Sequence, residues 1–359
     1  MKIVFLGLTI TSSWGNGHAT TFRALVRELA RRGHEITFLE RDVPWYAANR
    51  DLDPADSEAD VILYQSLAGL RKHAQLVRDA DTVIVGSYVP EGIDVCKWVH
   101  ATAGGVKAFY DIDTPVTLAR MVAGDCDYLI PGLIPDFDIY LSFAGGRTLD
   151  RLEQEYGSPR ARAFYCSVDP TRYFPENQTE RWDLGYLGTY SDDRQPALER
   201  LLLEPARRLP EGNFVVAGPQ YPPEIAWPGN VARIEHLPPE DHRAFYNRQR
   251  FTLNVTRADM VAAGHSPSVR LFEAAACGTP IISDPWDGLD EIFDIGTEIL
   301  VARDPRDVMN YLADISAEQA AAIGEAGRRR VLAAHTAAHR AAELETYLGE
   351  VTRPTAAFA

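Results

Sequence analysis

The sequence predicts an α/β protein made of two doubly wound domains that face a cleft. Short apolar runs alternate with amphipathic stretches over most of the chain, which is the rhythm of parallel strands covered by helices. The length of 359 residues suits two domains of ordinary size. A polar segment at Asp169–Arg181, which contains Pro170 and Pro175, interrupts the rhythm near the middle and predicts the joint.

The first half begins with a buried strand and an amphipathic helix. Lys2–Leu8 is apolar after its first residue, as in a parallel strand that is covered on both faces. His18–Arg32 carries its apolar residues on one helical stripe, and Gly33 follows as a typical C-terminal glycine. The further strands expected here are Glu35–Leu39, Val61–Tyr64, Thr82–Gly86 and Val106–Tyr110, and the further helices are Leu67–Asp79 and Glu91–Ala103.

The second half repeats this pattern and ends in helices. Its expected strands are Asp183–Leu187, Phe214–Ala217, Val231–Ile234, Phe251–Val255 and Pro280–Ser283, and its expected helices are Arg194–Arg208, Glu240–Arg248 and Val269–Ala276. Residues 304–350 predict helix almost throughout, before a frayed tail from Pro354. We therefore expect a first domain at 1–170, a second at 171–340 and a C-terminal segment at 341–359.

Composition and charge exclude several classes of protein. With 36 Lys and Arg against 51 Asp and Glu, the net charge is −15. This argues against nucleic acid or an anionic membrane as a partner, because both need clustered basic residues. Four scattered cysteines without a CxxC pair disfavour a disulfide framework or a structural zinc site. The apolar N-terminal run suits a strand better than a signal peptide, and no stretch approaches the ~18 residues that span a bilayer, so we expect a cytoplasmic protein.

A loop with two glycines, Gly15-Asn16-Gly17-His18, joins the first strand to the first helix. Glycines let the backbone approach a ligand closely, and a helix start offers unpaired N–H groups to an anion. The spacing is not GxGxxG, so it does not predict a dinucleotide site. In a two-domain cleft His18 would face the other domain and could contact a substrate. A plain strand-to-helix loop is the alternative.

The segment Ser266–Pro280 predicts a short helix that begins at an anion site. Ser266 suits the N-cap and Pro267 the first helical position. The N-terminus of such a helix, at the carboxyl end of a strand, is a ready diphosphate site. Arg270 and Glu273 share one helix face. The carboxylate of Glu273, one turn further into the helix than the diphosphate site, is well placed to accept hydrogen bonds from ribose hydroxyls. A simple salt bridge between these two residues is the alternative.

Two further motifs follow strands. Gly185–Arg194 combines small residues with an arginine at the start of the next helix, which suits phosphate contacts; an exposed turn with a solvated Arg194 is the alternative. Asp111 and Asp113 end a strand of the first half. A D-x-D pattern can bind a divalent metal, but it recurs elsewhere by chance, so a metal is not expected. Asp113 could contact a substrate in the cleft, or simply cap the helix near Pro115.

At this point the sequence resembles a known family. S-P-S-V-R-L-F-E-A-A-A-C-G-T-P-I-I-S-D, residues 266–284, is similar to the donor-binding segment of GT-B glycosyltransferases of the retaining, family-4 kind, and looks closest to the CgeB-like branch named for spore maturation. Other motifs of that branch are matched at residues 15–20, 38–51, 110–118, 164–170 and 184–195. The resemblance covers about residues 1–340.

The resemblance implies the GT-B fold, with an N-terminal domain that holds the acceptor and a C-terminal domain that holds a nucleotide-sugar. A final helix, for which Ala341–Val351 is the candidate, usually crosses back to the first domain. Glu273 matches the glutamate that holds the ribose, and Ser268, Val269 and Arg270 match the diphosphate end. The other donor-binding residues expected are Arg194, Arg257, Thr256, His265 and Gly188, and Gly15, Asn16 and Gly17 form an acceptor-side loop.

The sequence also departs from the family. Family-4 enzymes carry a second glutamate eight positions before the first, where this chain has His265, which leaves the sugar and the stereochemistry of transfer open. The usual histidine of the first domain's catalytic loop is replaced, because Asp111 and Asp113 occupy that strand end. These carboxylates, with His18, are the expected catalytic residues. They could accept the acceptor's proton or stabilise an oxocarbenium-like sugar.

These observations predict a glycosyltransferase that moves a hexose-type sugar from an NDP-sugar, with UDP or dTDP favoured, to an unknown acceptor. Arginines and helix amides would stabilise the leaving diphosphate, so no metal or other cofactor is expected. Two alternatives remain open: a nucleotide-sugar epimerase on the same fold, and a non-catalytic nucleotide-sugar-binding protein of a surface-polymer assembly. The base, sugar, acceptor and oligomeric state are not given by the sequence.

Overall fold

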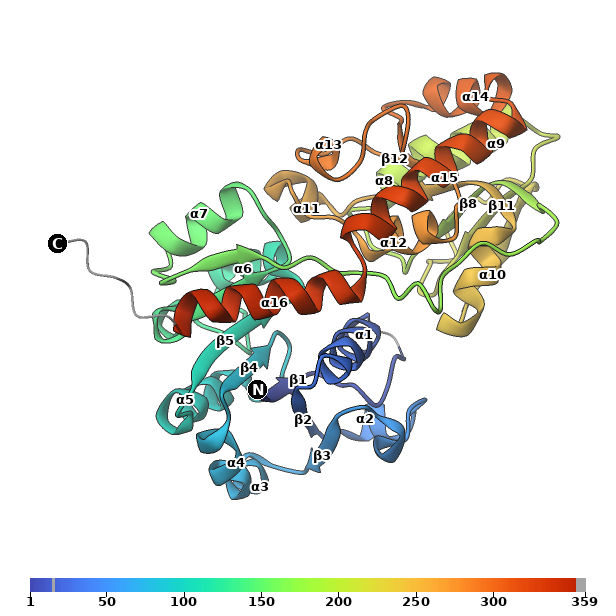
Figure 1. Cartoon of the computed structure of the whole chain (residues 1–359). Coiled ribbons are helices and arrows are strands. Elements are labelled where there is room, and N and C mark those ends of the chain that lie inside the picture. The colour runs from blue at the N-terminus through green and yellow to red at the C-terminus, as the bar shows by residue number, and fades with distance from the viewer. Residues whose placement is uncertain (15–16, 353–359) are drawn as a thin grey trace. The chain divides into compact units, whose positions relative to one another are not determined.

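Two parallel β-sheets organise the chain, one in each of two units (Figure 1). The computed structural model describes residues 1–14 and 17–352. Unit 1 comprises Met1–Ser167 and the C-terminal residues from Ala337, and unit 2 comprises Val168–Thr336. The division falls just before the polar segment in which the sequence places the joint, and the chain returns to unit 1 at Ala337.

The sheet of unit 1 has the order β3-β2-β1-β4-β5-β6-β7, and every neighbouring pair is parallel. Its strands are β1 (Lys2–Gly7), β2 (Glu35–Arg41), β3 (Asp60–Tyr64), β4 (Thr82–Gly86), β5 (Val106–Asp111), β6 (Ile139–Ser142) and β7 (Ala161–Ala163). The strands β6 and β7 were not predicted from the sequence, because runs of three or four apolar residues also occur in loops.

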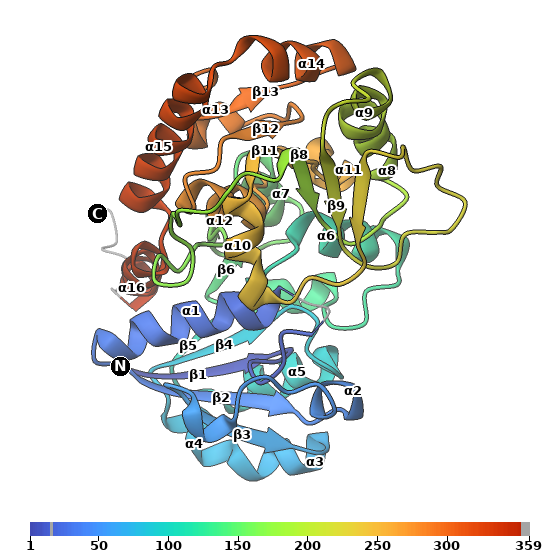
Figure 2. The ribbon, with the colours of Figure 1, turned by 90° about the vertical axis from the view of Figure 1, so that its right-hand side faces the viewer.

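The helices of unit 1 cover both faces of its sheet (Figure 2). They are α1 (His18–Arg31), α2 (Pro44–Ala47), α3 (Leu67–Leu70), α4 (Ala74–Asp79), α5 (Gly92–Thr102), α6 (Thr114–Ala123), α7 (Arg147–Gln154) and α16 (Ala337–Thr352). Strand β1 serves both cores, since side chains alternate across a strand. Ile3 and Phe5 pack in the core that contains α1 residues, and Val4 and Leu6 pack in the core that contains α5 residues. The predicted helix at 67–79 is interrupted by a 3₁₀ turn, Arg71–His73.

The C-terminal helix α16 belongs to unit 1 and completes its core. Leu344 and Leu348 are buried in the same cluster as Phe22 of α1. At the rim, Arg32 donates from Nε to Glu345 at 2.8 Å. Burial of each leucine side chain contributes about 1.5–3 kcal/mol to the stability of the fold. Helix α16 therefore stabilises unit 1.

The sheet of unit 2 has the order β10-β9-β8-β11-β12-β13 and is also parallel throughout. Its strands are β8 (Trp182–Leu187), β9 (Phe214–Ala217), β10 (Val231–Ile234), β11 (Gln249–Asn254), β12 (Ile281–Ser283) and β13 (Leu300–Val301). Its helices are α8 (Gln195–Leu198), α9 (Glu204–Arg208), α10 (His242–Asn247), α11 (Ala258–Ala263), α12 (Val269–Ala276), α13 (Leu289–Ile292), α14 (Pro305–Asp314) and α15 (Ala317–Ala334). Helix α12 has the predicted bounds, whereas the predicted helix at 194–208 contains a π-turn at Glu199–Leu203.

Membrane-spanning helices and disulfides are two features that the sequence does not predict. In the ranges 1–14 and 17–352, no helix combines the length and the apolar character that a membrane crossing demands. The four cysteines are buried, and none of them forms a disulfide within the described ranges.

Candidate functional site

The topological switch point of unit 2 lies between β8 and β11, because the strand order reverses there. Ligands of doubly wound sheets bind at such a point, outside the carboxyl ends of the strands. The guanidinium of Arg270, in the first turn of α12, lies at this point. Its Nε donates to the carbonyl of Leu187 at the end of β8 (2.5 Å), and its Nη1 donates to the side-chain oxygen of Asn254 at the end of β11 (3.1 Å).

Arg270 is a buried cation, with only 8% of its surface exposed. In the described part of the chain it forms no ion pair with a carboxylate; its other neighbours are Ser268 Oγ at 3.3 Å from Nη1 and the ring of Tyr186 at 4.9 Å. A buried charge is costly unless it is paired. The first turn of α12 adds the positive end of its dipole. The switch point therefore favours an anionic ligand.

The N-cap of α12 differs from the predicted one, although the helix has the expected bounds Val269–Ala276. The N-cap is Ser268, whose Oγ accepts from the amide of Arg270 at 3.4 Å, and Val269 is the first helical residue. Ser266, the predicted cap, lies two residues earlier. Its hydroxyl is buried and has no hydrogen-bond partner among the described residues. Ser266 therefore precedes the helix and does not cap it.

Two glycines keep the backbone close to Arg270. A Cβ on Gly188 would lie 2.9 Å from Arg270 Nη2 and 2.5 Å from the Tyr186 hydroxyl. A Cβ on Gly218, which has a φ of +140°, would lie 2.1 Å from the carbonyl oxygen of Gly188. The loops after β8 and β9 are thus in contact, and any side chain at either position would displace the guanidinium or the loop.

Glu273 lies one turn further along α12 and is only 6% exposed. Its Oε2 accepts from the hydroxyl of Tyr246 at 3.2 Å, and His242 Nδ1 is 3.8 Å from the same oxygen. Burial, followed by the charge of Glu273, raises the pKa of Tyr173 well above its ordinary value. The alternative of an Arg270–Glu273 salt bridge is wrong: the guanidinium turns to the strand ends, and the carboxylate turns to the tyrosines.

The remaining donor-side residues lie on the loops that follow the strands. Arg194 donates to Ser191 Oγ (2.9 Å) and to the carbonyl of Thr189 (2.7 Å), so it folds over its own loop. Arg257 Nε is 3.8 Å from Asp193. The Thr256 hydroxyl donates to a buried aspartate, Asp284, at 2.8 Å, so it fixes the β11 loop.

His265 has a left-handed backbone, with a φ of 46°. Its Nε2 lies 3.0 Å from a carboxylate oxygen of Glu291, and a Cβ on Gly288 would meet its ring at 2.4 Å. A non-glycine residue with positive φ is uncommon and indicates a conformation that the surroundings impose. His265 is therefore held against the loop before α13.

Unit 1 gathers His18, Tyr88 and Asp113 at the carboxyl edge of its own sheet. The Tyr88 hydroxyl donates to Asp113 Oδ2 at 3.0 Å, and its ring stands edge-on to His18 with centroids 5.4 Å apart. The Nδ1 atom of His18 is buried without a partner among the described residues, and burial lowers the pKa of His18 to about 4. This places a neutral imidazole and a carboxylate on either side of one tyrosine.

Asp111 does not join this group. It is fully buried, and it accepts from the hydroxyls of Tyr140 (2.6 Å) and Thr117 (2.8 Å) and from the amide of Asp113 (3.2 Å). Burial raises its pKa to about 6, although these hydrogen bonds oppose the shift. The oxygens of Asp111 are thus occupied and enclosed at the end of β5, and its catalytic role stays a sequence-based prediction.

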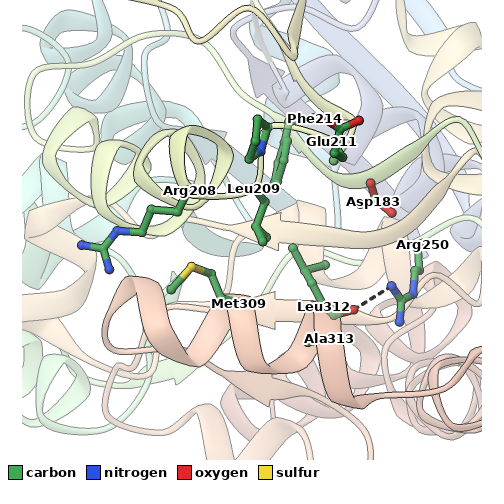
Figure 3. A pocket seen from close by; sticks show the side chains of 11 residues that line it. Asp183, Arg208, Leu209, Glu211, Phe214, Arg250, Met309, Leu312 and Ala313 are labelled. Carbon is green, nitrogen blue, oxygen red and sulfur yellow. Dashed lines mark hydrogen bonds between the residues drawn. The ribbon is translucent and has the colours of Figure 1, made fainter.

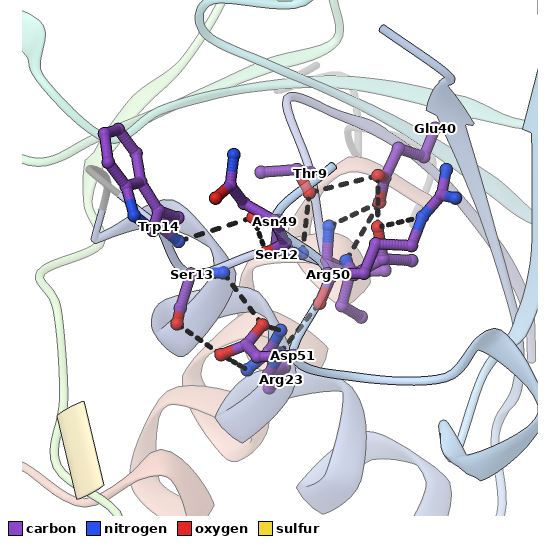
Figure 4. Close-up of polar contacts among 11 residues, drawn as sticks. Thr9, Ser12, Ser13, Trp14, Arg23, Glu40, Asn49, Arg50 and Asp51 are labelled. Atoms are coloured by element: carbon purple, nitrogen blue, oxygen red, sulfur yellow. Dashed lines mark hydrogen bonds and ion pairs between the residues drawn. The ribbon is translucent and has the colours of Figure 1, made fainter. Parts of the chain in front are cut away.

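The loop after β1 is fixed by two carboxylates, as Figure 4 shows. Glu40, buried at the end of β2, accepts from the amides of Ile10 (2.7 Å) and Thr11 (3.0 Å). Asp51 accepts from the Ser13 amide at 3.0 Å and pairs with Arg23. Among the predicted acceptor-side residues, Gly15 and Asn16 lie outside the described residues, and Gly17 is exposed at the N-cap of α1.

An apolar cavity of about 350 Å³ lies elsewhere in unit 2 (Figure 3). Asp183, Phe214 and Arg250 line it at the amino ends of β8, β9 and β11, and Met309 and Leu312 of α14 line its other side. It is at the edge of the sheet opposite to Arg270, so it is not part of the switch-point site.

Three residues of these sites were not predicted. Tyr88 and Asn254 could have been predicted from the sequence, because polar residues at or directly after the end of a buried parallel strand indicate the ligand-binding edge of the sheet. Tyr246 gave no such signal, since an aromatic residue in a helical segment normally predicts core packing.

Comparisons with known proteins agree with this architecture. A family model described as glycosyl transferase-like matches residues 194–346, less than half of the chain. No curated protein sequence matches. Among solved structures, sucrose-phosphate synthase from Thermosynechococcus elongatus is 14% identical, with 98% of this chain and 99% of that chain covered and a TM-score of 0.70. HepE from Anabaena, in complex with UDP and glucose, is 12% identical over 98% of this chain and 100% of that chain, with a TM-score of 0.69.

An α-glucosyltransferase in complex with UDP is also similar, with 12% identity, 97% of this chain and 100% of that chain covered, and a TM-score of 0.70. At these identities the likeness concerns the fold. The chain therefore has the GT-B fold of glycosyltransferases, with two Rossmann-like α/β units.

Proposed function

We propose that this protein is a glycosyltransferase that moves a hexose-type sugar from an NDP-sugar to an acceptor. The observation that carries the proposal is the buried guanidinium of Arg270, which lies at the switch point of unit 2 without a carboxylate partner among the described residues. A diphosphate supplies the missing negative charge. Glu273, one turn further along the helix, accepts hydrogen bonds from the ribose hydroxyls. The UDP complexes of similar structures support a nucleotide donor.

In the proposed reaction, an acceptor hydroxyl forms a bond to the anomeric carbon, and the bond from that carbon to the diphosphate breaks. The nucleoside diphosphate leaves with the electron pair, and Arg270 and the first amides of α12 stabilise its developing charge. Because these groups supply the positive charge, the proposed transfer needs no metal; Arg194 and Arg257 lie beside Asp193 on the neighbouring loops. Asp113 receives the proton of the acceptor hydroxyl, and Tyr88 and His18 set its surroundings.

The first test is a thermal-shift screen of UDP, GDP, dTDP and their sugar conjugates, with and without EDTA. A ligand that binds only the folded state raises the midpoint once its concentration exceeds Kd. We expect one nucleotide, UDP or dTDP, to raise the midpoint equally with and without EDTA. No shift with any nucleotide would contradict the proposal, and a shift that EDTA abolishes would contradict metal independence.

Product analysis then separates transfer from its alternatives. The protein is incubated with the bound NDP-sugar and no acceptor. A glycosyltransferase releases nucleoside diphosphate slowly by transfer to water. An epimerase converts the sugar while it stays on the nucleotide, and a non-catalytic binding protein leaves the conjugate unchanged.

A further inference from the structure

Unit 1 exposes an aromatic pair near the loop that leads into α1. Trp14 and Trp45 are 43% and 56% exposed, and their ring centroids are 4.6 Å apart with an interplanar angle of 82°. In this edge-to-face arrangement Trp45 keeps more than half of its surface exposed. Of the other tryptophans, Trp98 and Trp286 are buried, and Trp182 and Trp227 are half-buried. Large aromatic side chains left in water at a ligand-binding edge mark a contact surface.

The pair lies at the carboxyl edge of the unit 1 sheet. Trp14 belongs to the connection between β1 and α1, and Trp45 belongs to α2, which follows β2. The same β1–α1 connection ends at His18, whose ring contacts the ring of Tyr88. The strand order places β1 and β2 side by side, so the two indoles stand on adjacent loops of the edge that carries the candidate catalytic groups.

Hydrogen bonds join the backbones that carry the two rings. The Ser12 hydroxyl donates to the carbonyl of Asn49 at 2.7 Å, and the Asn49 side chain donates to the carbonyl of Trp45 at 2.8 Å. Figure 4 shows the Trp14 indole turned away from the polar cluster that fixes its loop. The two loops that carry the aromatic pair are therefore joined before any ligand arrives, which reduces the entropy lost on binding.

The surrounding charges define the class of ligand. The cations near the pair are already engaged, because Arg23 pairs with Asp51 and Arg50 pairs with Asp42. Among the described residues of this cluster, both arginines are thus paired and do not recruit a phosphate or nucleic acid. The apolar part of this surface is the two indoles, and the polar cluster on the same loops contains these ion pairs. A neutral sugar ring fits both features, since its C–H face packs on an indole and its hydroxyls bond to a polar rim.

We propose that Trp14 and Trp45 form an acceptor subsite that binds a neutral saccharide by stacking. This inference rests on the proposed glycosyl transfer and names the class of its acceptor: a sugar ring whose hydroxyl receives the transferred sugar. The aromatic pair binds and orients the acceptor. It takes no part in the proton transfer assigned to Asp113.

The test uses the full chain on an array of neutral mono- and oligosaccharides in the presence of UDP, followed by fluorescence titration with the best-bound sugar. We expect Trp45→Ala to weaken saccharide binding by about tenfold or more and Trp45→Phe to retain most of it, because a smaller aromatic face remains. The control is Val122→Ala, a change of a still more exposed apolar residue on α6 (71% exposed), which leaves binding unchanged. All variants keep the UDP affinity of the wild type.

The outcomes separate the two proposals. UDP binding without binding of any neutral saccharide, or equal saccharide binding by wild type and Trp45→Ala, overturns the acceptor subsite and leaves glycosyl transfer intact. Binding to lipid vesicles that Trp45→Ala abolishes, without saccharide binding, also overturns it. Saccharide binding that depends on Trp45, in a protein that binds no nucleotide, supports the subsite while the proposed function fails.

Discussion

Arg270 donates a hydrogen bond from Nη1 to the side-chain oxygen of Asn254 at 3.1 Å, and so joins the first turn of α12 to the end of β11. The amide of Asn254 donates in turn to Thr256 Oγ1 (3.2 Å) and Ser283 Oγ (3.0 Å). The orientation of Asn254 is thereby fixed, with its oxygen toward the guanidinium. A buried cation is thus positioned by neutral groups at the point where a doubly wound sheet binds its ligand.

Replacement of this cation tests its role in diphosphate binding. We expect Arg270→Met to weaken UDP binding by about tenfold or more and to change uridine binding little, because the charge acts on the diphosphate and not on the nucleoside. Isothermal titration with both ligands measures the difference. Arg250→Met is the matched control, since Arg250 also donates to backbone carbonyls (Leu312 and Ile315) but lies at the opposite edge of the sheet. An equal loss for uridine and UDP would contradict the assignment.

Glu273 is expected to act on the nucleoside. Glu273→Ala should weaken the binding of both UDP and uridine by about tenfold, because the carboxylate accepts hydrogen bonds from ribose. Glu273→Gln keeps an oxygen that can accept from Tyr246, so it separates loss of the ligand contact from loss of the fold. Both variants are measured by titration and by thermal unfolding. Wild-type UDP affinity in Glu273→Ala would remove this residue from the site.

Asp113 is expected to act on turnover alone. Asp113→Ala should lower kcat by about 10²–10⁴, the usual contribution of a general base, and leave donor affinity unchanged. Tyr88→Phe removes the hydroxyl that bonds Asp113 Oδ2 and keeps the ring that contacts His18, so we expect a smaller loss of about tenfold. Rates of donor consumption with and without acceptor provide the measurement. Unchanged turnover in Asp113→Ala would exclude it from the mechanism.

His18 should remain neutral far below the pH at which an exposed histidine titrates. Burial lowers its pKa to about 4 from an ordinary value of 6.5. Between these values the unfolded chain binds a proton that the folded chain does not, so this group makes the fold less stable as pH falls from 6.5 to 4. NMR titration of the ring, assigned with His18→Gln, checks this. A midpoint near 6.5 would show that the imidazole is solvated.

Asp111 has the opposite dependence. Burial raises its pKa to about 6 from 3.8, so the folded chain retains a proton that the unfolded chain loses, and this group's contribution to stability falls as pH rises through that window. The shift corresponds to a loss of roughly 3 kcal/mol in the free energy of unfolding at neutral pH, relative to acidic pH. We expect the unfolding free energy of wild type, relative to Asp111→Asn, to decrease between pH 4 and 7 in urea titrations. A constant difference over that range would show that Asp111 is not held in this way.

The fold could be predicted because its signals are local. The alternation of apolar runs and amphipathic helices gave the two doubly wound units, and the bounds of α12 followed from its own residues. Strand β13, with two residues, was missed because pairing with β12 and not local sequence defines it. The resemblance to a CgeB-like branch remains a sequence-based prediction, as do the nucleotide and the stereochemistry of transfer.

The sequence by itself determined which residue types follow which strands, and therefore that Arg270, Glu273, His18 and Asp113 lie at ligand-binding edges. Only the tertiary structure decided their roles. It turned Arg270 away from Glu273, enclosed Asp111, and placed Tyr88 between His18 and Asp113. The physical reason is that the charge state and availability of a side chain depend on burial and on partners from distant elements, such as Leu187 for Arg270, and these contacts exist only after both sheets have formed.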